Sequence, residues 1–202
     1  PRPPQFFAEE LAGLAPDRCL IEAGDLAVYF LRGEEALHLR QELGRLRELT
    51  FRHAGEGTGK ALDLDRFDRY YGHVVLWNKP KQELVGAYRV GRTADILPEY
   101  GIEGLYTSTL FHYDPQFFQK LGPALELGRS FVRLEYQRQY APLLLLWKGI
   151  ARLVAKYPDS PVLFGAVASA RTRSRRAGLA SGLAASNGGS AKQRLSPSSR
   201  SG

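Results

Sequence analysis

Hydrophobic and polar positions along this chain repeat with two different periods. From Glu34 to about Phe51, apolar residues return every three or four positions, which is the spacing of an amphipathic helix. The run from Asp25 to Leu31 before it is typical of a strand. Two further runs, 73–78 and 84–91, are separated by a short polar segment and predict a β-hairpin. The pattern therefore predicts a strand, a long helix and an antiparallel pair.

The second half of the chain predicts more strands with helices between them. Asp114 and Pro115 start a short helix, because an acidic N-cap followed by proline at the first helical position favours one. Gly128 interrupts a strand pattern, which indicates a β-bulge. The expected elements are a helical turn over 94–99, strands over 105–113, 124–132 and 162–167, and an apolar helix over 141–156. The fold class is therefore α+β, with a mostly antiparallel sheet flanked by helices.

The domain organisation follows from where these patterns begin and end. Residues 1–24 are expected to form an N-terminal extension or linker, and residues 25–167 a single domain. Residues 168–202 are rich in Ser, Gly, Ala and Arg, and we expect this basic tail to be disordered. The chain starts at Pro1 without Met, which favours a processed protein or a segment cut from a longer one.

The charges are unevenly distributed along the chain. The 202 residues carry a formal charge of +7, but all 21 acidic residues lie at or before Asp159, and residues 1–165 contain 21 Lys and Arg. The body is therefore neutral, and the excess lies in the tail. A neutral body argues against a nucleic-acid partner, although the tail leaves binding of phosphate, RNA or anionic lipid as an alternative function.

Two further counts limit the class of protein. A single cysteine, Cys19, excludes an internal disulfide framework and a Cys-rich zinc site, and it suits the cytoplasm. The longest uninterrupted apolar run, Leu143 to Trp147, is far shorter than the ~20 residues of a membrane-spanning helix.

Common catalytic motifs are absent from the sequence. It contains no P-loop, no Gly-x-Ser-x-Gly motif and no His-Glu-x-x-His motif. No histidine is followed by Asp at the spacing of glycerolipid acyltransferases. No metal site is expected.

Charged residues at positions where a fold usually buries apolar ones are the best candidates for chemistry. Arg47 falls within the apolar stripe of the long helix, whereas Arg45 points away from it. Arg89 and Arg129 alternate with apolar residues on their strands. Buried arginines need acidic partners. The available acids are Asp63, Asp65, Asp68 and Glu126. Residue types alone leave two interpretations open, structural ion pairs and a charged active site.

Four short segments resolve this choice by resemblance. In chain order they are Arg47-x-x-x-Phe51, Asp65-Arg-Phe-Asp68, Val85-Gly-Ala-Tyr-Arg89 and Glu126-Leu-Gly-Arg129-Ser130. In this order and spacing they resemble the GNAT-like N-acyltransferases, which include acyl-homoserine lactone synthases and ornithine-lipid N-acyltransferases. The similarity spans about residues 25–167 and is greatest to acyltransferase domains labelled hemolysin-like. In longer relatives this domain can be fused to a glycerolipid acyltransferase domain.

The resemblance implies transfer of a fatty acyl group from an acyl carrier protein thioester to the amine of an amino acid such as ornithine, in membrane lipid synthesis. It implies no bound cofactor, and it allows peripheral contact with the inner membrane surface. Glu126 is the first candidate for the base that deprotonates the amine, with Asp65 or Asp68 second. Backbone N–H groups at Gly128 would stabilise the oxyanion. The substrate-binding ionic cluster would include Arg47, Phe51, Arg89, Arg129 and Ser130.

Two departures from the family change these expectations. The stretch 132–140 contains no glycine, whereas CoA-dependent relatives bind the pyrophosphate with a glycine-rich turn at a helix N-terminus. A carrier-bound donor is therefore favoured over acyl-CoA. From Ala168 to Arg176 the sequence departs from the family and becomes low in complexity. We expect a truncated or frameshifted reading frame there, which leaves an inactive remnant as a further alternative.

Overall fold

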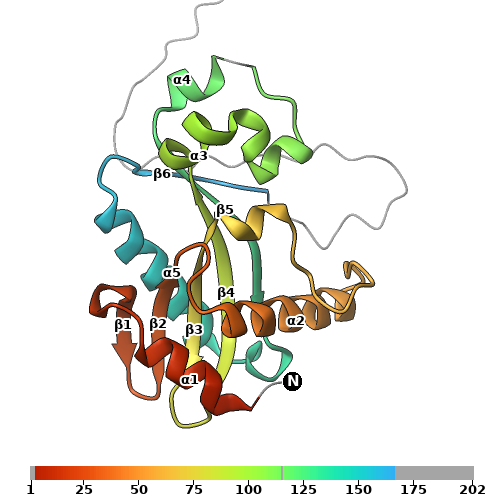
Figure 1. Cartoon of the computed structure of the whole chain (residues 1–202), viewed down its shortest axis with the longest axis vertical. Coiled ribbons are helices and arrows are strands. Elements are labelled where there is room, and N and C mark those ends of the chain that lie inside the picture. Colours follow the sequence, from red (N-terminus) through yellow and green to blue (C-terminus); the bar gives the residue numbers. More distant parts are fainter. Residues whose placement is uncertain (1–2, 115, 167–202) are drawn as a thin grey trace, which may run out of the picture.

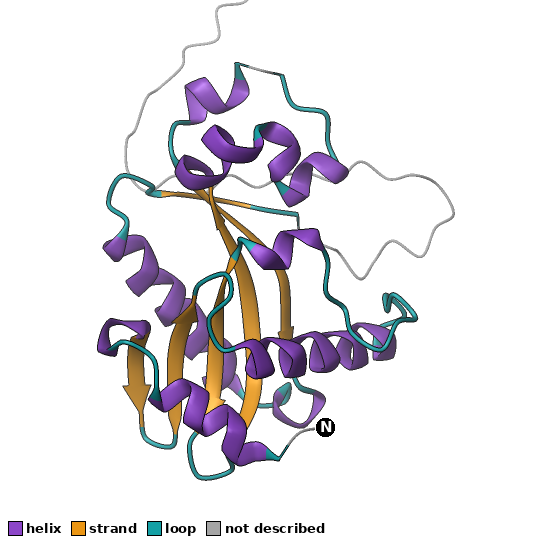
Figure 2. Ribbon diagram, in the orientation of Figure 1, coloured by secondary structure: helices purple, strands orange, loops and turns teal. Residues whose placement is uncertain are grey.

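The structure is a computed structural model that describes residues 3–114 and 116–166, and it contains a six-stranded sheet with helices on both faces (Figures 1 and 2). The strands are β1 (Cys19–Ala23), β2 (Leu26–Leu31), β3 (Gly72–Asn78), β4 (Glu83–Arg92), β5 (Ala124–Val132) and β6 (Val162–Phe164). The α-helices are α1 (Pro4–Ala12), α2 (Leu37–His53), α3 (Thr93–Tyr100), α4 (Phe117–Leu121) and α5 (Tyr140–Lys156).

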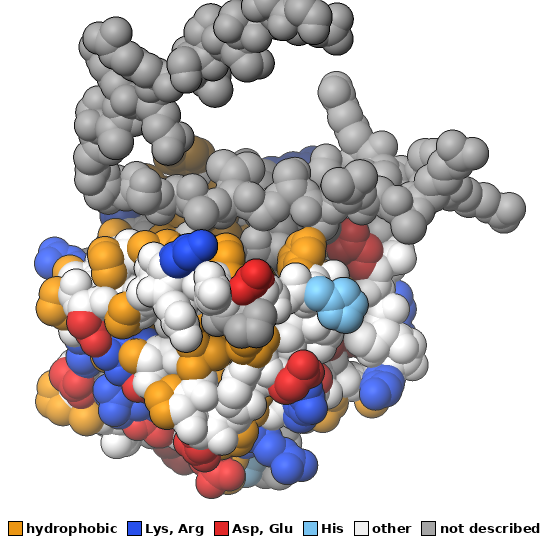
Figure 3. All heavy atoms as spheres, turned by 90° about the horizontal axis from the view of Figure 1, so that it is seen from above, with side chains coloured by type: hydrophobic (Ala, Val, Ile, Leu, Met, Phe, Trp, Pro, Cys, Tyr) orange, Lys and Arg blue, Asp and Glu red, His pale blue; other side chains and the backbone are white. Residues whose placement is uncertain are grey.

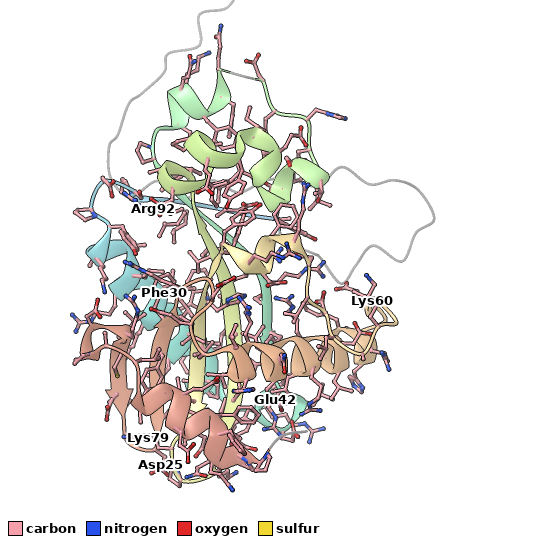
Figure 4. The ribbon with its side chains drawn as sticks, viewed as in Figure 1. Asp25, Phe30, Glu42, Lys60, Lys79 and Arg92 are labelled. Atoms are coloured by element: carbon pink, nitrogen blue, oxygen red, sulfur yellow. The ribbon has the colours of Figure 1, made fainter. Side chains whose placement is uncertain are left out.

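The sheet follows the chain order from β1 to β6. The first four strand pairs are antiparallel, and β5 pairs with β6 in parallel. Short turns join β1 to β2 and β3 to β4, whereas the connections from β2 to β3 and from β4 to β5 contain helices. The parallel pair of β5 and β6 needs a crossover, which α5 provides. At the lower end of the sheet the Lys79 N–H donates to the Asp25 carbonyl (2.8 Å), beside the turn between β1 and β2 (Figure 4). The predicted α+β class with a mostly antiparallel sheet is confirmed.

Helices α1 and α2 cover one face of the sheet, and α5 covers the other (Figure 1). The core on the α2 face contains Leu39, Leu43, Leu46, Val75, Trp77 and Phe131. The core on the α5 face contains Val28, Val74, Leu76, Leu146, Ile150 and Leu153. The α2 leucines recur every three or four residues, as the sequence pattern predicted.

The prediction that residues 1–24 form an extension or linker is wrong. β1 pairs with β2 as the edge strand of the sheet, and α1 packs against α2. Glu10 of α1 accepts hydrogen bonds from the backbone N–H groups of His38 (2.9 Å) and Leu39 (2.8 Å). The first turn of a helix has unpaired N–H donors. Residues that precede the predicted domain therefore cap α2.

The predicted strand over 105–113 is also wrong. The 3₁₀ turn Tyr106–Thr109 occupies the start of this region, directly after another 3₁₀ turn, Ile102–Gly104. Both turns lie with α3 and α4 beyond the end of the sheet (Figures 1 and 2). Leu105, Tyr106 and Tyr113 of this segment pack instead into a third core with Phe67, Tyr71, Ile96 and Phe118. Seen from above, the described surface of this end mixes hydrophobic and charged side chains (Figure 3).

Other boundaries differ by a few residues. The long helix begins at Leu37 rather than Glu34, because Ala36 adopts a left-handed conformation (φ 50°). The last strand ends at Phe164 rather than Val167. The tail 168–202, with its predicted disorder and its departure from the family, lies outside the described residues. Among the residues that the structure describes, no helix is long and apolar enough to cross a membrane.

Candidate active site

An ionic cluster of three arginines, three aspartates and one histidine lies between α2 and the sheet. Its members are Arg47, Arg89, Arg129, Asp63, Asp65, Asp68 and His73. Arg47 is the centre of the cluster and is completely buried. Its Nε donates to Asp63 Oδ2 (3.0 Å), and its Nη1 and Nη2 donate to the two oxygens of Asp68 (3.1 and 2.8 Å). This confirms that Arg47 faces inward and is paired with acids.

Asp68 is a shared acceptor. It receives bonds from Arg47, from the Nε2 of His73 (3.0 Å) and from the backbone N–H of Asp65 (2.8 Å). Burial by itself would raise the pKa of Asp68, but these hydrogen bonds and the charges of Arg47 and Arg89 outweigh it and hold that pKa well below its usual range. Asp68 is therefore ionised at all pH values near neutrality.

His73 is fully buried beside Asp68. Burial lowers the pKa of His73, although its bond to Asp68 opposes this, so the ring is neutral at pH 7. An ionised carboxylate can only accept, so Nε2 carries the proton. With a neutral His73, the three arginines and three aspartates of the cluster balance.

Arg89 is buried against aromatic rings. Its Nη1 donates to Asp65 Oδ1 (2.7 Å) and lies 3.4 Å from Asp68. Its guanidinium carbon lies 4.7 Å from the centre of the Tyr106 ring and 5.3 Å from that of Tyr71. This confirms the expected apolar surroundings and shows that the arginine charge is held by both carboxylates and ring faces.

The predicted bulge in β5 is present, and it determines the position of Arg129. Arg89 is opposite Gly128 and Ala87 is opposite Phe131, so Arg129 and Ser130 together face the single residue Tyr88. The left-handed backbone falls on Arg129 (φ 46°) rather than on Gly128. Such a conformation is costly for a residue with a side chain, and bulges re-aim side chains near active sites. Here the bulge turns Arg129 toward Asp63 (3.4 Å) and Asp65 (4.0 Å).

Only the outer edge of the cluster is accessible to solvent. The side chains of Asp65 and Arg129 are 27% and 22% exposed, whereas those of Asp63 and Asp68 are nearly completely buried. A small molecule can therefore reach Asp65 without displacing the buried ion pairs.

Glu126 lies apart from the arginine hydrogen bonds. It is buried, and its carboxylate accepts hydrogen bonds from the Tyr71 hydroxyl and from the backbone N–H groups of Thr107 (2.6 Å) and Tyr106 (3.3 Å). Burial is the main cause that raises the pKa of Tyr71, and the negative charge of Glu126 raises it further. The Tyr71 hydroxyl therefore keeps its proton and can donate a hydrogen bond. The geometry joins Glu126 to the 106–109 turn.

An open groove of about 330 Å³ begins beside the cluster. It is lined by residues from the end of α2, the bulged part of β5 and the start of α5, among them Phe51, Tyr88, Ser130, Val132, Leu134 and Leu143. The Phe51 ring lines this groove and lies 5.8 Å from the guanidinium carbon of Arg129, so the groove and the cluster are adjacent. A mostly apolar groove beside a charged edge suits a substrate with an apolar chain and a polar reacting end.

The glycine-rich segment after α2, residues 55–60, is attached to the helix by Glu48. The Glu48 carboxylate accepts from the Thr58 hydroxyl (2.7 Å), the Thr58 and Gly59 N–H groups (2.9 and 3.0 Å), and Arg52 (2.7 Å). These hydrogen bonds lower the pKa of Glu48 to about 2. Lys60 marks the far end of this segment (Figure 4).

The structure thus brings together most of the residues singled out from the sequence, and it adds His73, Tyr71, Tyr106 and Glu48. His73 is opposite Arg89 in the hairpin formed by β3 and β4. The residue pairing between β3 and β4 would have placed His73 in the cluster, but this pairing could not be predicted from the sequence pattern. Within the described residues, no three His, Cys, Asp or Glu side chains are placed to hold a metal ion.

Comparison with known proteins identifies this architecture. Residues 46–148, about half of the chain, match the family model for the acetyltransferase (GNAT) domain. The chain belongs to the GNAT family. The matched range contains the whole ionic cluster, the β5 bulge and the groove. The resemblance deduced from four short motifs is therefore confirmed.

Two relatives and one solved structure add detail to this GNAT domain. The chain is 37% identical over 151 residues to a glycine N(alpha)-acyltransferase of Bacteroides thetaiotaomicron, covering 69% of this chain and 45% of the relative. It is 36% identical over 149 residues to a glycine N(alpha)-acyltransferase of Phocaeicola vulgatus, with 68% and 46% covered. The chain thus spans about half the length of these relatives. The crystal structure of the acyl-homoserine lactone synthase LasI is similar in fold, with a TM-score of 0.51, 16% identity and coverage of 70% of this chain and 72% of that one.

Proposed function

We propose that this GNAT domain transfers a fatty acyl group from a thioester to the amine of an amino acid. The observation that carries the proposal is the 37% identity over 151 residues to a protein named glycine N(alpha)-acyltransferase. The apolar groove and the partly exposed carboxylate of Asp65 agree with it, because the reaction needs room for an acyl chain and a proton acceptor for the amine.

Asp65 is the better candidate for the proton acceptor. Glu126, the first candidate from the sequence, is buried and already accepts three hydrogen bonds. Asp65 is the most exposed carboxylate of the cluster. Its hydrogen bonds from Arg89 and from the Phe67 N–H both end on Oδ1, so among the described residues its Oδ2 accepts none. The ammonium group loses one proton to Asp65, and the nitrogen attacks the thioester carbon. When the C–S bond breaks, the second amine proton passes to the sulfur, which leaves as a thiol.

The developing oxyanion needs fixed hydrogen-bond donors. We assign this role to backbone N–H groups at the bulge around Gly128, because a bulge leaves one residue of the ladder unpaired. Ser130 and Phe51 line the groove next to this point and would contact the donor.

An acyl carrier protein is the proposed donor. The connection between β5 and α5 contains a 3₁₀ turn, Leu134–Tyr136, and no glycine. It therefore lacks the closely approaching backbone with which glycine-rich turns bind a pyrophosphate. Acyl-CoA is expected to be the poorer donor. Glycine is the first acceptor to test, since both relatives are named for it, and ornithine is the second.

The test is acyl transfer by the purified protein. We expect N-acylglycine, detected by mass spectrometry, when the protein is incubated with a long-chain acyl carrier protein and glycine, and a lower rate with the matching acyl-CoA. Asp65→Asn should lower kcat by about 100-fold or more, with Asp114→Asn, an acidic residue outside the cluster, as the control. The absence of acylated product with glycine, ornithine and other amino acids would contradict the proposal.

A further inference from the structure

Arg129 differs from the other two arginines of the cluster in how its charge is satisfied. Arg47 and Arg89 each donate hydrogen bonds of 3.1 Å or less to aspartates. Among the described residues, the acidic partners of Arg129 lie at ion-pair distances of 3.4 and 4.0 Å and accept no hydrogen bond from it. Its buried Nε has no hydrogen-bond partner within the part of the chain that the structure describes. The Nη2 of Arg89 also lacks one there, but the Arg89 side chain is 1% exposed, whereas that of Arg129 is 22% exposed. Part of its donor capacity is therefore unused.

Two aromatic rings hold the guanidinium of Arg129 in place without accepting hydrogen bonds from its N–H groups. Its guanidinium carbon lies 5.2 Å from the centre of the Tyr106 ring and 5.8 Å from that of Phe51. Ring contacts of this kind stabilise a guanidinium plane while its N–H edges remain available. The left-handed backbone at the bulge fixes the direction of the side chain, at a cost that a structural surface arginine would not require.

Arg129 and Asp65 together form the accessible edge of the cluster. One of these side chains is cationic and the other anionic, and their nearest charged atoms are 4.0 Å apart. A zwitterionic α-amino acid carries the opposite pair of charges on a single carbon. The arginine fork is well suited to a carboxylate, and Asp65 is suited to an ammonium group.

We propose that this edge recognises the acceptor as a zwitterion, with the α-carboxylate bound by Arg129 and the ammonium group bound by Asp65. The inference rests on the proposed function and makes it more specific. It requires a free carboxylate on the acceptor, and it orients the amine so that the proton leaves to Asp65 while the nitrogen faces the groove beside Ser130. Amines without a carboxylate fit the same space but leave Arg129 without its partner.

The experiment compares glycine with glycinamide, which keeps the amine and removes the carboxylate charge. For the unmodified protein, kcat/KM should be about 10- to 100-fold higher for glycine, the range expected from hydrogen bonds between charged groups. Arg129→Gln should reduce this ratio to near one, and Arg129→Lys should restore part of it. Arg133→Gln is the matched control, because Arg133 is similarly exposed but pairs with Glu83 and Glu135. Thermal unfolding of each variant checks folding.

Calorimetric titration with glycine and glycinamide separates the inference from the proposed function. Selective glycine binding that is lost in Arg129→Gln supports the inference even if no product forms, in which case the proposed function alone fails. If the protein acylates both amines equally, or Arg129→Gln slows both by the same factor, the carboxylate is not read by Arg129 and the inference is wrong. If glycine does not bind and is not acylated, both fail.

Discussion

Arg47 lies completely inside the protein and keeps its charge, which is possible because its donors meet two aspartates. Its three nitrogens bond to Asp63 and Asp68, including the backbone carbonyl of Asp63. Removing one member of a buried ion pair leaves the others charged and unpaired, which costs more than the pair contributes when intact. The arginine is thus essential to the fold through the aspartates it neutralises.

Replacing Arg47 should therefore unfold much of the population. We expect Arg47→Met to lower the free energy of unfolding by about 3–5 kcal/mol, because Asp63 and Asp68 stay buried and lose their hydrogen bonds from Arg47. Urea unfolding measures this change. Arg45→Met is the control on the same helix, since Arg45 is partly exposed and bonds to Glu42 on the surface. It should change stability by less than about 1 kcal/mol. Equal effects of the two variants would show that the cluster does not stabilise the fold.

Helix α2 connects the N-terminal segment, the ionic cluster and the groove. Its first turn is capped by Glu10 of α1, its middle carries Arg47, and its last turns carry Glu48 and Phe51. No residue of α2 itself caps its N-terminus, because Ala36 has no side-chain acceptor. The position of the helix on the sheet therefore depends on contacts from outside it.

The capping role of Glu10 can be measured directly. Glu10→Ala should lower the free energy of unfolding by about 1 kcal/mol, as the loss of an N-cap does. The neighbouring Glu9 is exposed, so Glu9→Ala should have little effect. A similar loss in both variants would indicate that general charge, rather than capping, is responsible.

The Glu48 hydrogen bonds should persist into acid. The folded pKa of about 2 lies below the ordinary value of 4.5, so the stabilisation is complete above pH 4.5 and is lost as the pH falls toward 2. Hydrogen exchange at the Thr58 and Gly59 amides should therefore remain slow at pH 5. Glu48→Gln should speed exchange at these amides, whereas Glu56→Gln, in the same segment, should not. Fast exchange in the unmodified protein would contradict the hydrogen bonds.

The folded body as a whole is nearly neutral, so its response to pH comes from particular buried groups. In the folded protein the pKa values of His73 and Asp68 are both lowered, so both side chains stay deprotonated at pH values where the unfolded chain binds a proton on them. Below pH 6.5 the unfolded chain binds a proton on His73 that the folded protein does not, so stability falls as the pH falls. Below pH 3.8 the same holds for Asp68, whose folded pKa is depressed. Both effects favour the folded state at neutral pH.

Stability should thus decline between pH 6.5 and pH 4, before most carboxylates titrate. The contribution of His73 to this slope is at most about 1.4 kcal/mol per pH unit. Urea unfolding at half-unit pH steps measures it. His73→Gln should flatten the decline in this range, and His53→Gln, which alters an exposed histidine, should leave it unchanged. An unaltered slope in His73→Gln would show that His73 is not held neutral.

Local signals were sufficient wherever neighbours in the chain determine the structure. The apolar stripe of α2 predicted which face is buried and that Arg47 lies on it, because helical spacing is a local property. The break at Gly128 predicted a bulge in β5. The four motifs identified the family, and so the class of chemistry.

Only the tertiary structure decided what depends on distant partners. Residues 105–113 have strand-like composition, but Glu126, some twenty residues away, takes up the N–H groups of Tyr106 and Thr107 and holds a turn there. The role of the N-terminal segment depends on Glu10 meeting the start of α2. Which carboxylate is accessible depends on packing around the whole cluster, and it moved the candidate base from Glu126 to Asp65. Residue type and spacing determined that charges would be buried together, whereas burial, register and the bulge determined which of them a substrate can reach.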